Sequence, residues 1–559
     1  MSSSEPVERI PLLVRAADDA TELFVLDGKL NLVARGLGRL EGRFEPGIYK
    51  VKARSGYVTE ERRVVLTGPQ PWAVSFGPLE FASPALLVST AQTHEYQMAA
   101  AERESGQVHE SLAKEGDSLI FIFARRWTGS PSQELSAGKV NPAEGLSFHY
   151  ASGRRAVDLR SVGNVDLTGD PWAACTIRVN SGLYRLRLTR HEGPALEQTV
   201  VACPGWQTQV FLQQYPHPSE SDQLYADLTS ASILMARSHG PGSGQPVFHA
   251  RDPAMRLAEQ ARLGLANGRQ VLADSVVREI LDGKFDNPLL GLFGAHLLLQ
   301  KWEADQQAKR SAGGPVADRL GGEQSRTVFD EYLDGLYGGG VTFQTIVENL
   351  RRLLGHGTHP DVEALALLLD PSGGGYRFQA PPTLRRNRRG KLVGAHGGRY
   401  RFEIPPMLRR SWALVVAATA EHPELVPEGS LASQIAERLW GEEPWLVWMK
   451  PPVKVELGDE GEPDEFEIAL RHQMERFPAS LHYSSLRDAP TRSESQHVGS
   501  EVVDALAAHP ALEVGPAPAH PALSPEAIAG LVRTLGLPRT SVERLVRKIS
   551  DSDFQHSPR

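Results

Sequence analysis

Two stretches of this chain match each other closely, and this repeat constrains the fold more than any other feature. GIYKVKARSGYVTEERRVVLTGPQPWAVSF, residues 47–76, lines up with GLYRLRLTRHEGPALEQTVVACPGWQTQVF, residues 182–211. Each copy opens on Gly-aliphatic-Tyr, continues through a polar hairpin into a Val-Val strand, and ends after a proline-containing turn and a tryptophan. Self-similarity of this length indicates one supersecondary unit used twice. We therefore predict two β-sandwich modules, residues 8–82 and 116–216, joined by a loop and helix over residues 83–115.

The hydrophobic spacing changes from strand-like to helical after the second copy. Apolar residues recur three and four positions apart through AMRLAEQARLGLANGRQVL and NPLLGLFGAHLLLQKW, and glycine-rich joints separate the segments that follow. The fold class we predict is multidomain α and β, with the two sandwich modules followed by a solenoid-like helical region. The predicted divisions after the modules are helical hairpins at 250–372, a basic β-hairpin-like insertion at 373–411, a helical region with an acidic segment at 412–475, a linker at 476–523 and a helical hairpin at 524–550.

Composition places the chain among ordinary soluble globular proteins. Of its 559 residues, 41% are hydrophobic and 23% are charged, and the net charge of -8 disfavours coating of nucleic acid along the whole length. The two cysteines are too few for a disulfide framework or a four-thiolate metal site. The first residues do not resemble a signal peptide, and no apolar run is long enough to span a bilayer. We therefore expect a cytoplasmic protein that makes no membrane contact and carries no metal or cofactor.

A basic phrase occurs twice in quick succession, as YRFQAPPTLRR at residues 376–386 and YRFEIPPMLRR at residues 400–410. Between the first tyrosine and the last arginine the only acidic residue is Glu403. Arginine presents a planar fork of donors to carboxylate or phosphate, and the tyrosines and phenylalanines of both copies are expected to stack on a planar ligand group. The candidate partner-binding residues are Arg377, Arg385, Arg386, Arg388, Arg389, Arg401, Arg409 and Arg410.

Three interpretations of this insertion stay open. In the first, the arginines are solvated or pair with the chain's own acidic segment, residues 456–467, because charge runs usually form solvated faces. In the second, they dock an acidic surface of a protein partner. In the third, they contact a phosphate backbone. The second is favoured over the third because no zinc-finger, helix-turn-helix or RNA-binding signature accompanies the arginines.

Catalytic signatures are few. The chain has no dinucleotide fingerprint, no Walker loop and no His-Glu-x-x-His helix. His94, beside a glutamate, is the best candidate base for a hydrolase, and Cys175 and Cys203 are the candidate thiol nucleophiles, although both cysteines also suit small apolar core positions. His296 lies in an apolar helical segment and is expected to be a neutral core histidine. We assign no catalytic residue and favour a protein without enzymatic activity.

Two resemblances bear on function. The Gly-x-Tyr strand and hairpin of the repeated units are similar to carboxypeptidase-regulatory or PEGA-like β-sandwiches, which implies spacers or binding modules. The phrases NPLLGLFGAHLLL, HPDVEALALLL and PPMLRRSWALVVAA, within about residues 250–420, resemble bacterial accessory proteins encoded beside caspase-like or trypsin-like peptidases in conflict and defence loci. That resemblance implies an adaptor whose partner is a peptidase effector, and it transfers no catalytic residue.

Overall fold

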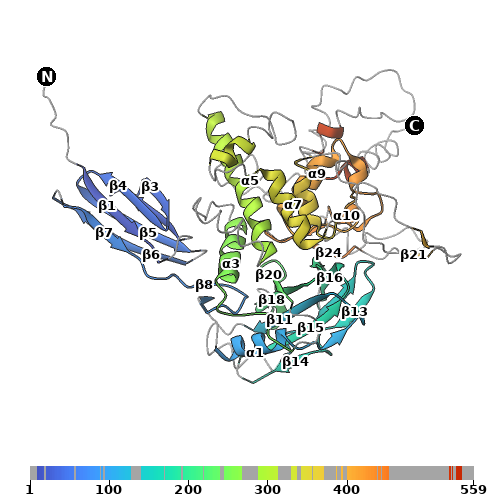
Figure 1. Ribbon diagram of the computed structural model, residues 1–559. Helices are drawn as coiled ribbons and strands as arrows, with labels where there is room; N and C mark the ends of the chain where they lie inside the picture. The colour runs from blue at the N-terminus through green and yellow to red at the C-terminus, as the bar shows by residue number, and fades with distance from the viewer. Residues whose placement is uncertain are drawn as a thin grey trace, which may run out of the picture.

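The computed structural model places strands mostly in the N-terminal half of the chain and helices after them (Figure 1). It describes residues 9–451 with gaps, and some residues between 528 and 543. The longest gaps within 9–451 are 127–139, 267–286, 312–328 and 370–399, the last interrupted by two short strands. None of the helices in these described parts is both long and apolar enough to cross a membrane.

The first unit is a 7-stranded sheet with the order β6-β5-β2-β3-β4-β1-β7. Its alternating burial follows the alternating sequence, as in β5, where every second residue faces a hydrophobic core that belongs to this unit alone. In Figure 1 the unit extends away from the rest of the molecule. Its strands are β1 (Ile10–Arg15), β2 (Glu22–Leu26), β3 (Leu32–Leu37), β4 (Arg39–Phe44), β5 (Gly47–Ser55), β6 (Val58–Leu66) and β7 (Trp72–Ser75).

The second unit consists of two sheets that contribute to one large core. One sheet has the order β10-β15-β11-β18-β19, with β14 on β15 and β20 on β18, and the other begins β13-β12-β16-β17. Its strands are β10 (Glu110–Ser111), β11 (Ser118–Arg126), β12 (Leu146–Tyr150), β13 (Arg155–Asp158), β14 (Asn164–Asp166), β15 (Trp172–Val179), β16 (Gly182–Leu188), β17 (Leu196–Ala202), β18 (Trp206–His217), β19 (Glu220–Ala226) and β20 (Ser232–Arg237).

The repeated sequence corresponds to a repeated strand order. In the first unit β1 pairs antiparallel with β4 and parallel with β7, and in the second β11 pairs antiparallel with β15 and parallel with β18. The ladder β3-β2-β5-β6 likewise has its counterpart in β13-β12-β16-β17. Tyr49 and Tyr184 begin the matching hairpins, and each hydroxyl donates to the backbone carbonyl four residues upstream at 2.9 Å.

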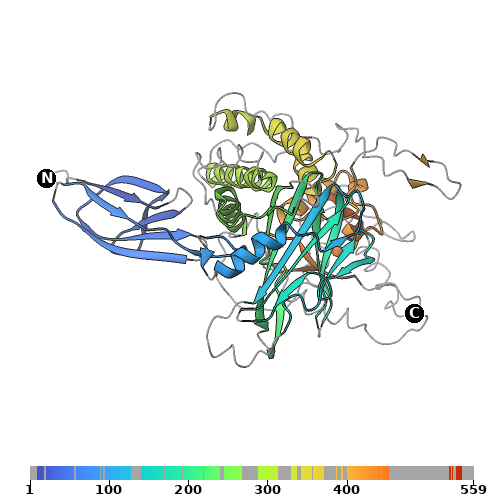
Figure 2. The same cartoon turned by 60° about the horizontal axis from the view of Figure 1, so that its bottom comes forward.

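Short elements connect the two units. After β8 (Phe81–Ala82) and β9 (Thr90–Ala91), helix α1 (Glu95–Ser105) lies against β15 of the second unit (Figure 2). Thr176 on β15 holds the end of this helix, because its hydroxyl donates to the Glu104 carbonyl at 2.8 Å.

The helical region follows, and three of its α-helices begin with proline, whose missing N–H and fixed φ suit the first turn. Thr342 caps another, α7, by accepting a hydrogen bond from the Thr345 amide. The helices are α3 (Pro253–Ala266), α5 (Pro288–Ser311), α7 (Phe343–Leu354), α8 (Pro360–Ala366), α9 (Arg409–Thr419), the 3₁₀ turn η1 (Pro423–Leu425) and α10 (Leu431–Ile435). The strands are β21 (Arg385–Arg386), β22 (Leu392–Val393), β23 (Leu439–Trp440) and β24 (Val447–Met449).

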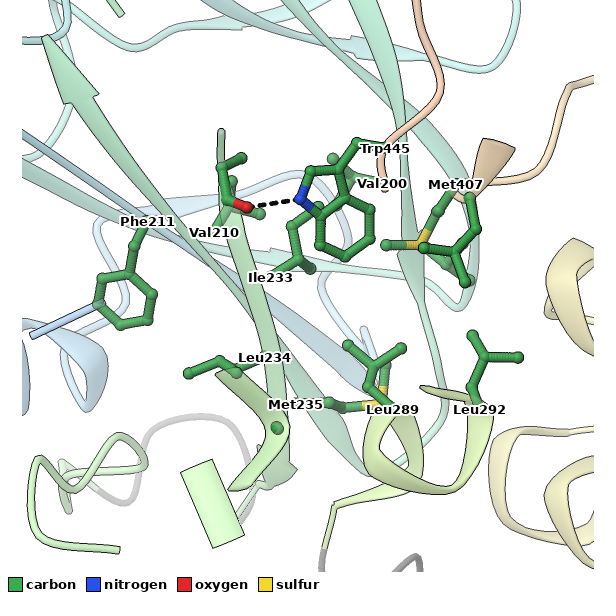
Figure 3. Close-up of a cluster of buried hydrophobic side chains, with 14 of the residues drawn as sticks. Val200, Val210, Phe211, Ile233, Leu234, Met235, Leu289, Leu292, Met407 and Trp445 are labelled. Atoms are coloured by element: carbon green, nitrogen blue, oxygen red, sulfur yellow. Dashed lines mark hydrogen bonds between the residues drawn. The ribbon is translucent and has the colours of Figure 1, made fainter. Parts of the chain in front are cut away.

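The helical region and the second unit are packed into one body. Strand β24 pairs antiparallel with β17, so that its sheet runs β13-β12-β16-β17-β24-β23. Behind it, the buried Trp445 indole donates a hydrogen bond to the Ala231 carbonyl and lies among Val210, Ile233 and Met407 (Figure 3). The strands of this body therefore reach well beyond the predicted module of residues 116–216, because long-range pairing adds a segment that the local sequence pattern does not link to the repeat.

Candidate interaction surfaces

The first copy of the basic phrase ends on a small antiparallel ladder. Arg385 of β21 pairs with Val393 of β22, and Arg386 pairs with Leu392. In Figure 2 this ladder lies at the periphery, apart from the helices and from both units. Arg377, Arg388 and Arg389 lie outside the described residues, as does the acidic segment at 456–467. Internal pairing between that segment and the insertion therefore stays a prediction.

The second copy of the phrase is built into the helical region. Arg409 begins α9 and donates to the carbonyls of Trp440 and Gly441 at 2.7 and 2.5 Å. Arg410 forms an ion pair with Glu303 of α5 at 2.9 Å. Arg401, by contrast, is exposed. The arginine doublet of this copy thus has partners inside the chain.

The aromatic residues of the second copy are core residues. Phe402 is buried and packs edge-to-face against Tyr400, with 4.8 Å between the ring centroids. Phe402 belongs to a hydrophobic cluster with Trp412 and Trp448, and the partly buried Tyr400 packs against that cluster. The prediction that Phe402 stacks on a planar ligand is therefore wrong, since the core takes the ring.

The candidate nucleophiles of the hydrolase hypothesis are buried. Cys175 and Cys203 are free thiols inside the second unit. Burial raises the pKa of Cys175 to about 12 and also raises the pKa of Cys203, so that neither forms the thiolate that nucleophilic attack requires. His94 lies outside the described residues. Among the described residues no group of three or more His, Cys, Asp and Glu side chains is arranged to hold a metal ion.

His296 is the core histidine that its apolar helix predicts. It is buried in α5, and a ring nitrogen lies 3.0 Å from the Ser411 hydroxyl. Burial, with a smaller contribution from the nearby Arg410 charge, lowers the pKa of His296 to about 3. The ring is therefore neutral at physiological pH.

A histidine beside a carboxylate does occur, but at a position that the sequence analysis did not select. The His109 Nε2 atom lies 3.1 Å from the Glu104 carboxylate, which also accepts a hydrogen bond from Asn164 at 2.7 Å. The other ring nitrogen, Nδ1, accepts a hydrogen bond from the Thr176 amide at 3.0 Å. Both ring nitrogens are engaged, so that this cluster fastens α1 to the second unit.

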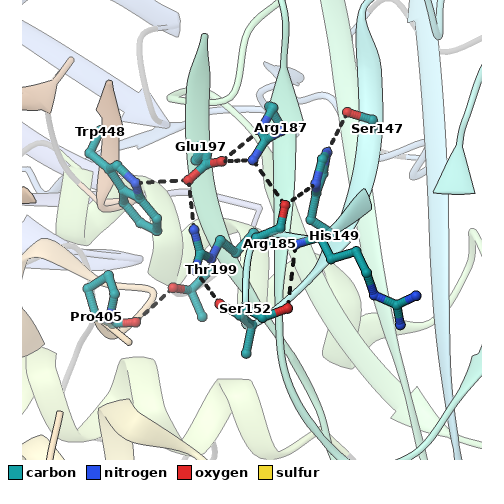
Figure 4. Close-up of polar contacts among 12 residues, drawn as sticks. Ser147, His149, Ser152, Arg185, Arg187, Glu197, Thr199, Pro405 and Trp448 are labelled. Carbon is teal, nitrogen blue, oxygen red and sulfur yellow. Dashed lines mark hydrogen bonds and ion pairs between the residues drawn. The ribbon is translucent and has the colours of Figure 1, made fainter. Parts of the chain in front are cut away.

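A buried ion cluster lies on the sheet that β24 extends (Figure 4). Glu197 of β17 is fully buried and pairs with Arg185 and Arg187 of β16, at 3.4 and 2.6 Å. The Trp448 indole donates to the same carboxylate at 3.3 Å, and the neighbouring Thr199 hydroxyl donates to the Pro405 carbonyl at 2.7 Å. This face of the second unit is thus covered by residues of the helical region.

His149 stands beside this cluster and is satisfied locally. Its Nδ1 atom lies 3.0 Å from the Gly153 carbonyl and its Nε2 atom lies 2.8 Å from the Ser147 hydroxyl (Figure 4). Because a carbonyl can only accept, Nδ1 carries the proton and Nε2 accepts from the serine. Burial lowers the pKa of His149, which fits this neutral ring.

The first unit carries the same arrangement of charges in an exposed form. Glu61 of β6 pairs with Lys50 and Lys52 of β5 at 2.6 and 3.7 Å. The cross-strand pair Lys52–Glu61 corresponds to Arg187–Glu197 in the second unit. When the repeats are aligned with a one-residue gap in the hairpin, Glu61 and Glu197 occupy the same position. This match is the signal by which the sequence could have revealed the cluster.

Comparisons with known proteins do not assign the chain to a family. No family model matches it, and no curated protein matches it. Among solved structures, the chain is similar to the Bacillus anthracis TIE protein, with 13% identity and a TM-score of 0.13. That match covers 33% of this chain and 29% of the other. A TM-score this low does not identify a shared fold.

Proposed function

We propose that this protein is a non-enzymatic adaptor that binds an acidic partner protein through its basic insertion. The observation that carries the proposal is that the two arginine doublets, Arg385–Arg386 and Arg409–Arg410, lie in different surroundings. Arg409 and Arg410 are engaged by carbonyls and by a carboxylate of the same chain. Arg385 and Arg386 lie on a ladder at the periphery of the molecule (Figure 2). The binding set is therefore Arg377, Arg385, Arg386, Arg388, Arg389 and Arg401.

The other parts of the chain serve this role as a framework. In the proposal the repeated units are β-sandwich modules that space or bind, and the helices of residues 250–372 form a solenoid-like array. The partner is a caspase-like or trypsin-like peptidase effector of a bacterial defence system in the cytoplasm, which rests on the resemblance of residues 250–420. The buried, high-pKa thiols of Cys175 and Cys203 argue against a cysteine nucleophile, so that the alternative hydrolase would depend on His94.

Charge reversal of the insertion tests the proposal. Arg385, Arg386, Arg388 and Arg389 are replaced together by glutamate, and the tagged protein is purified from its own host beside the wild type. We expect the partner that accompanies the wild type to be lost, because four attractive contacts with carboxylates become repulsive. The melting temperature is expected to stay within about 2 °C of the wild type, as surface substitutions rarely exceed about 0.5 kcal/mol.

A matched control reverses four exposed arginines on other elements, namely Arg39, Arg155, Arg160 and Arg352, and so changes the net charge equally. This control should retain the partner. A large fall in the melting temperature of the insertion variant would instead favour internal pairing with residues 456–467. A nucleic-acid partner would be favoured if the wild type and the control bind heparin at low salt and elute as the salt concentration rises, while the insertion variant does not bind.

A further inference from the structure

The first unit has apolar residues on the outer face of its β3-β2-β5-β6 ladder, the side turned away from the unit's core. Ile48 of β5 lies directly opposite Val65 of β6, and Leu26 of β2 lies opposite Leu32 of β3 and Lys50 of β5. Ile48 is 56% exposed, and Leu32 and Val65 are exposed as well. The apolar residues therefore lie in two adjacent cross-strand rows at one end of the ladder, Leu32–Leu26 and Ile48–Val65, and Lys50 and Arg63 continue the first row.

Exposed apolar side chains gather in this unit more than elsewhere. Six of the nine large apolar residues exposed in the described part of the chain belong to it, namely Leu30, Leu32, Val33, Ile48, Val65 and Trp72. Isolated exposed apolar residues are ordinary, whereas neighbouring ones mark an interaction surface. Of the six, Ile48 and Val65 are direct cross-strand neighbours. The unit extends away from the other described parts of the molecule (Figures 1 and 2), and these six side chains are exposed in the described structure.

Leu30, in the turn between β2 and β3, has an unfavourable backbone conformation and an exposed side chain. It has a φ of 66° and is 63% exposed, and no other non-glycine residue of the described chain has a positive φ. The turn is fixed by the Asp27 carboxylate, which accepts hydrogen bonds from the amides of Lys29 and Asn31 at 2.8 and 2.9 Å. Glycine or asparagine would adopt this conformation with less strain, of order 1 kcal/mol. A leucine here therefore serves something other than the stability of the turn.

The corresponding face of the second unit is covered by another part of the chain. The pair Ile48–Val65 corresponds to Leu183–Val201, and there Val201 is fully buried. On the same strand, Thr199 and Glu197 are bound by residues of the helical region, as described above. One copy of the repeat thus has its outer face covered by polypeptide, and the other copy presents the same face to solvent.

We propose that the outer face of the first unit binds a partner protein segment in which a large apolar side chain is flanked by carboxylates. The apolar side chain would lie on Leu30, Leu32, Ile48 and Val65. Arg63 lies opposite Lys50 and two residues from Val65 along β6, on the same face of the sheet. Its side chain is exposed and makes no ion pair with a described residue. In the second unit the polar Thr199 occupies this position, so that the free cation is particular to the first unit and selects an acidic ligand.

The ligand lies across the face and does not extend the sheet at its β6 edge. There Arg62 pairs with Glu60 at 2.8 Å and lies over the Phe76 ring, 5.0 Å from its centroid. Charged residues at an edge strand prevent the addition of another strand. The surface is separate from the arginine insertion, and the proposal does not depend on the function of that insertion.

A library of short random peptides displayed on phage, selected on the full-length protein, tests the proposal. We expect enrichment of peptides that combine an aromatic or aliphatic residue with neighbouring Asp or Glu. A synthetic copy of an enriched peptide, titrated by fluorescence anisotropy, should bind Ile48→Glu/Val65→Glu at least about tenfold more weakly than the wild type. Thr59→Glu, at the far end of β6, should bind normally, as should the insertion variant with four reversed arginines.

Two further variants keep the test decisive if the double substitution disturbs folding. Leu30→Gly should weaken peptide binding while the melting temperature stays equal or rises, and Arg63→Glu should weaken binding without a change in melting temperature. Failure to enrich such peptides, or equal binding by all these variants, would overturn the proposal. A wild-type dimer in sedimentation that Ile48→Glu/Val65→Glu dissociates would also overturn it, because the occupant would then be a second copy of the chain.

Discussion

Replacing Glu197 by alanine is expected to destabilise the second unit strongly, whereas the matching change at Glu61 should have little effect. Glu197 is fully buried, and the side chains of its partners Arg185 and Arg187 are only 10% and 13% exposed. Removal of one member of a buried ion cluster leaves uncompensated charge and costs about 3–5 kcal/mol. The Trp448 indole also loses its acceptor, a further loss of about 1 kcal/mol or less at 3.3 Å.

Glu61 provides the matched control because it pairs with two cationic residues at the corresponding positions of the repeat, Lys50 and Lys52, but is exposed to solvent. Its side chain is 40% exposed and its partner Lys50 is 41% exposed, so that water replaces the lost contacts. The lysines also hold the pKa of Glu61 below its usual value. Any contribution of this pair is therefore present above the ordinary glutamate pKa and disappears as the pH falls below it.

Hydrogen exchange followed by mass spectrometry measures each effect where it arises, since a chain with several units does not unfold in one step. Peptides from residues 182–202 should lose about 3–5 kcal/mol of opening free energy in Glu197→Ala, and peptides from residues 47–66 should change little in Glu61→Ala. Equal effects in the two variants would refute the reasoning, because burial would then not decide the strength of the cluster. If Glu197→Ala lowers the opening free energy of residues 182–202 only slightly, water must enter between β17 and β24 and solvate the arginines that the glutamate leaves unpaired.

Two other expectations follow from buried titratable groups. Because the pKa of His296 is lowered to about 3 from its ordinary value near 6.5, the unfolded chain takes up a proton as the pH falls through 6.5 while the folded chain does not. The contribution of the neutral ring to the free energy of unfolding is therefore full above pH 6.5 and falls by about 2 kcal/mol by pH 5. His296→Gln, whose amide can take the position of Nε2 beside Ser411, should flatten the wild-type pH dependence of urea unfolding by that amount. An unchanged profile would contradict a buried neutral ring. Cys175 and Cys203 should resist iodoacetamide at pH 8 in the native protein and react fully after denaturation, whereas rapid native labelling of one thiol would restore the hydrolase hypothesis.

The repeated hairpins of the two units could be predicted from the sequence, but the surroundings of the second unit could not. Alternating burial and the Gly-x-Tyr hairpin are local signals, and they place β5, β6, β16 and β17 where the repeat predicts them. The pairing of β17 with β24 joins residues about 250 positions apart, and no local pattern encodes it. The same holds for Arg410, whose partner Glu303 lies on another helix. Long-range contacts decided which charges are buried and which faces are covered.

The two copies of the basic phrase differ in sequence at two positions that are apolar in the second copy. Where the second copy has Ile404 and Met407, the first has Ala380 and Thr383. Met407 is almost fully buried in the main core (Figure 3), and its amide donates to Asp361 at 2.9 Å.

Burial of a methionine side chain contributes about 1.5–3 kcal/mol, which a threonine at the same position does not supply. The second copy therefore has an apolar anchor that fastens its arginines into the helical region, where Arg409 and Arg410 find carbonyl and carboxylate partners. The first copy keeps the arginines and prolines without that anchor. This sequence difference fits the proposal that the arginines of the first copy bind a partner outside the chain.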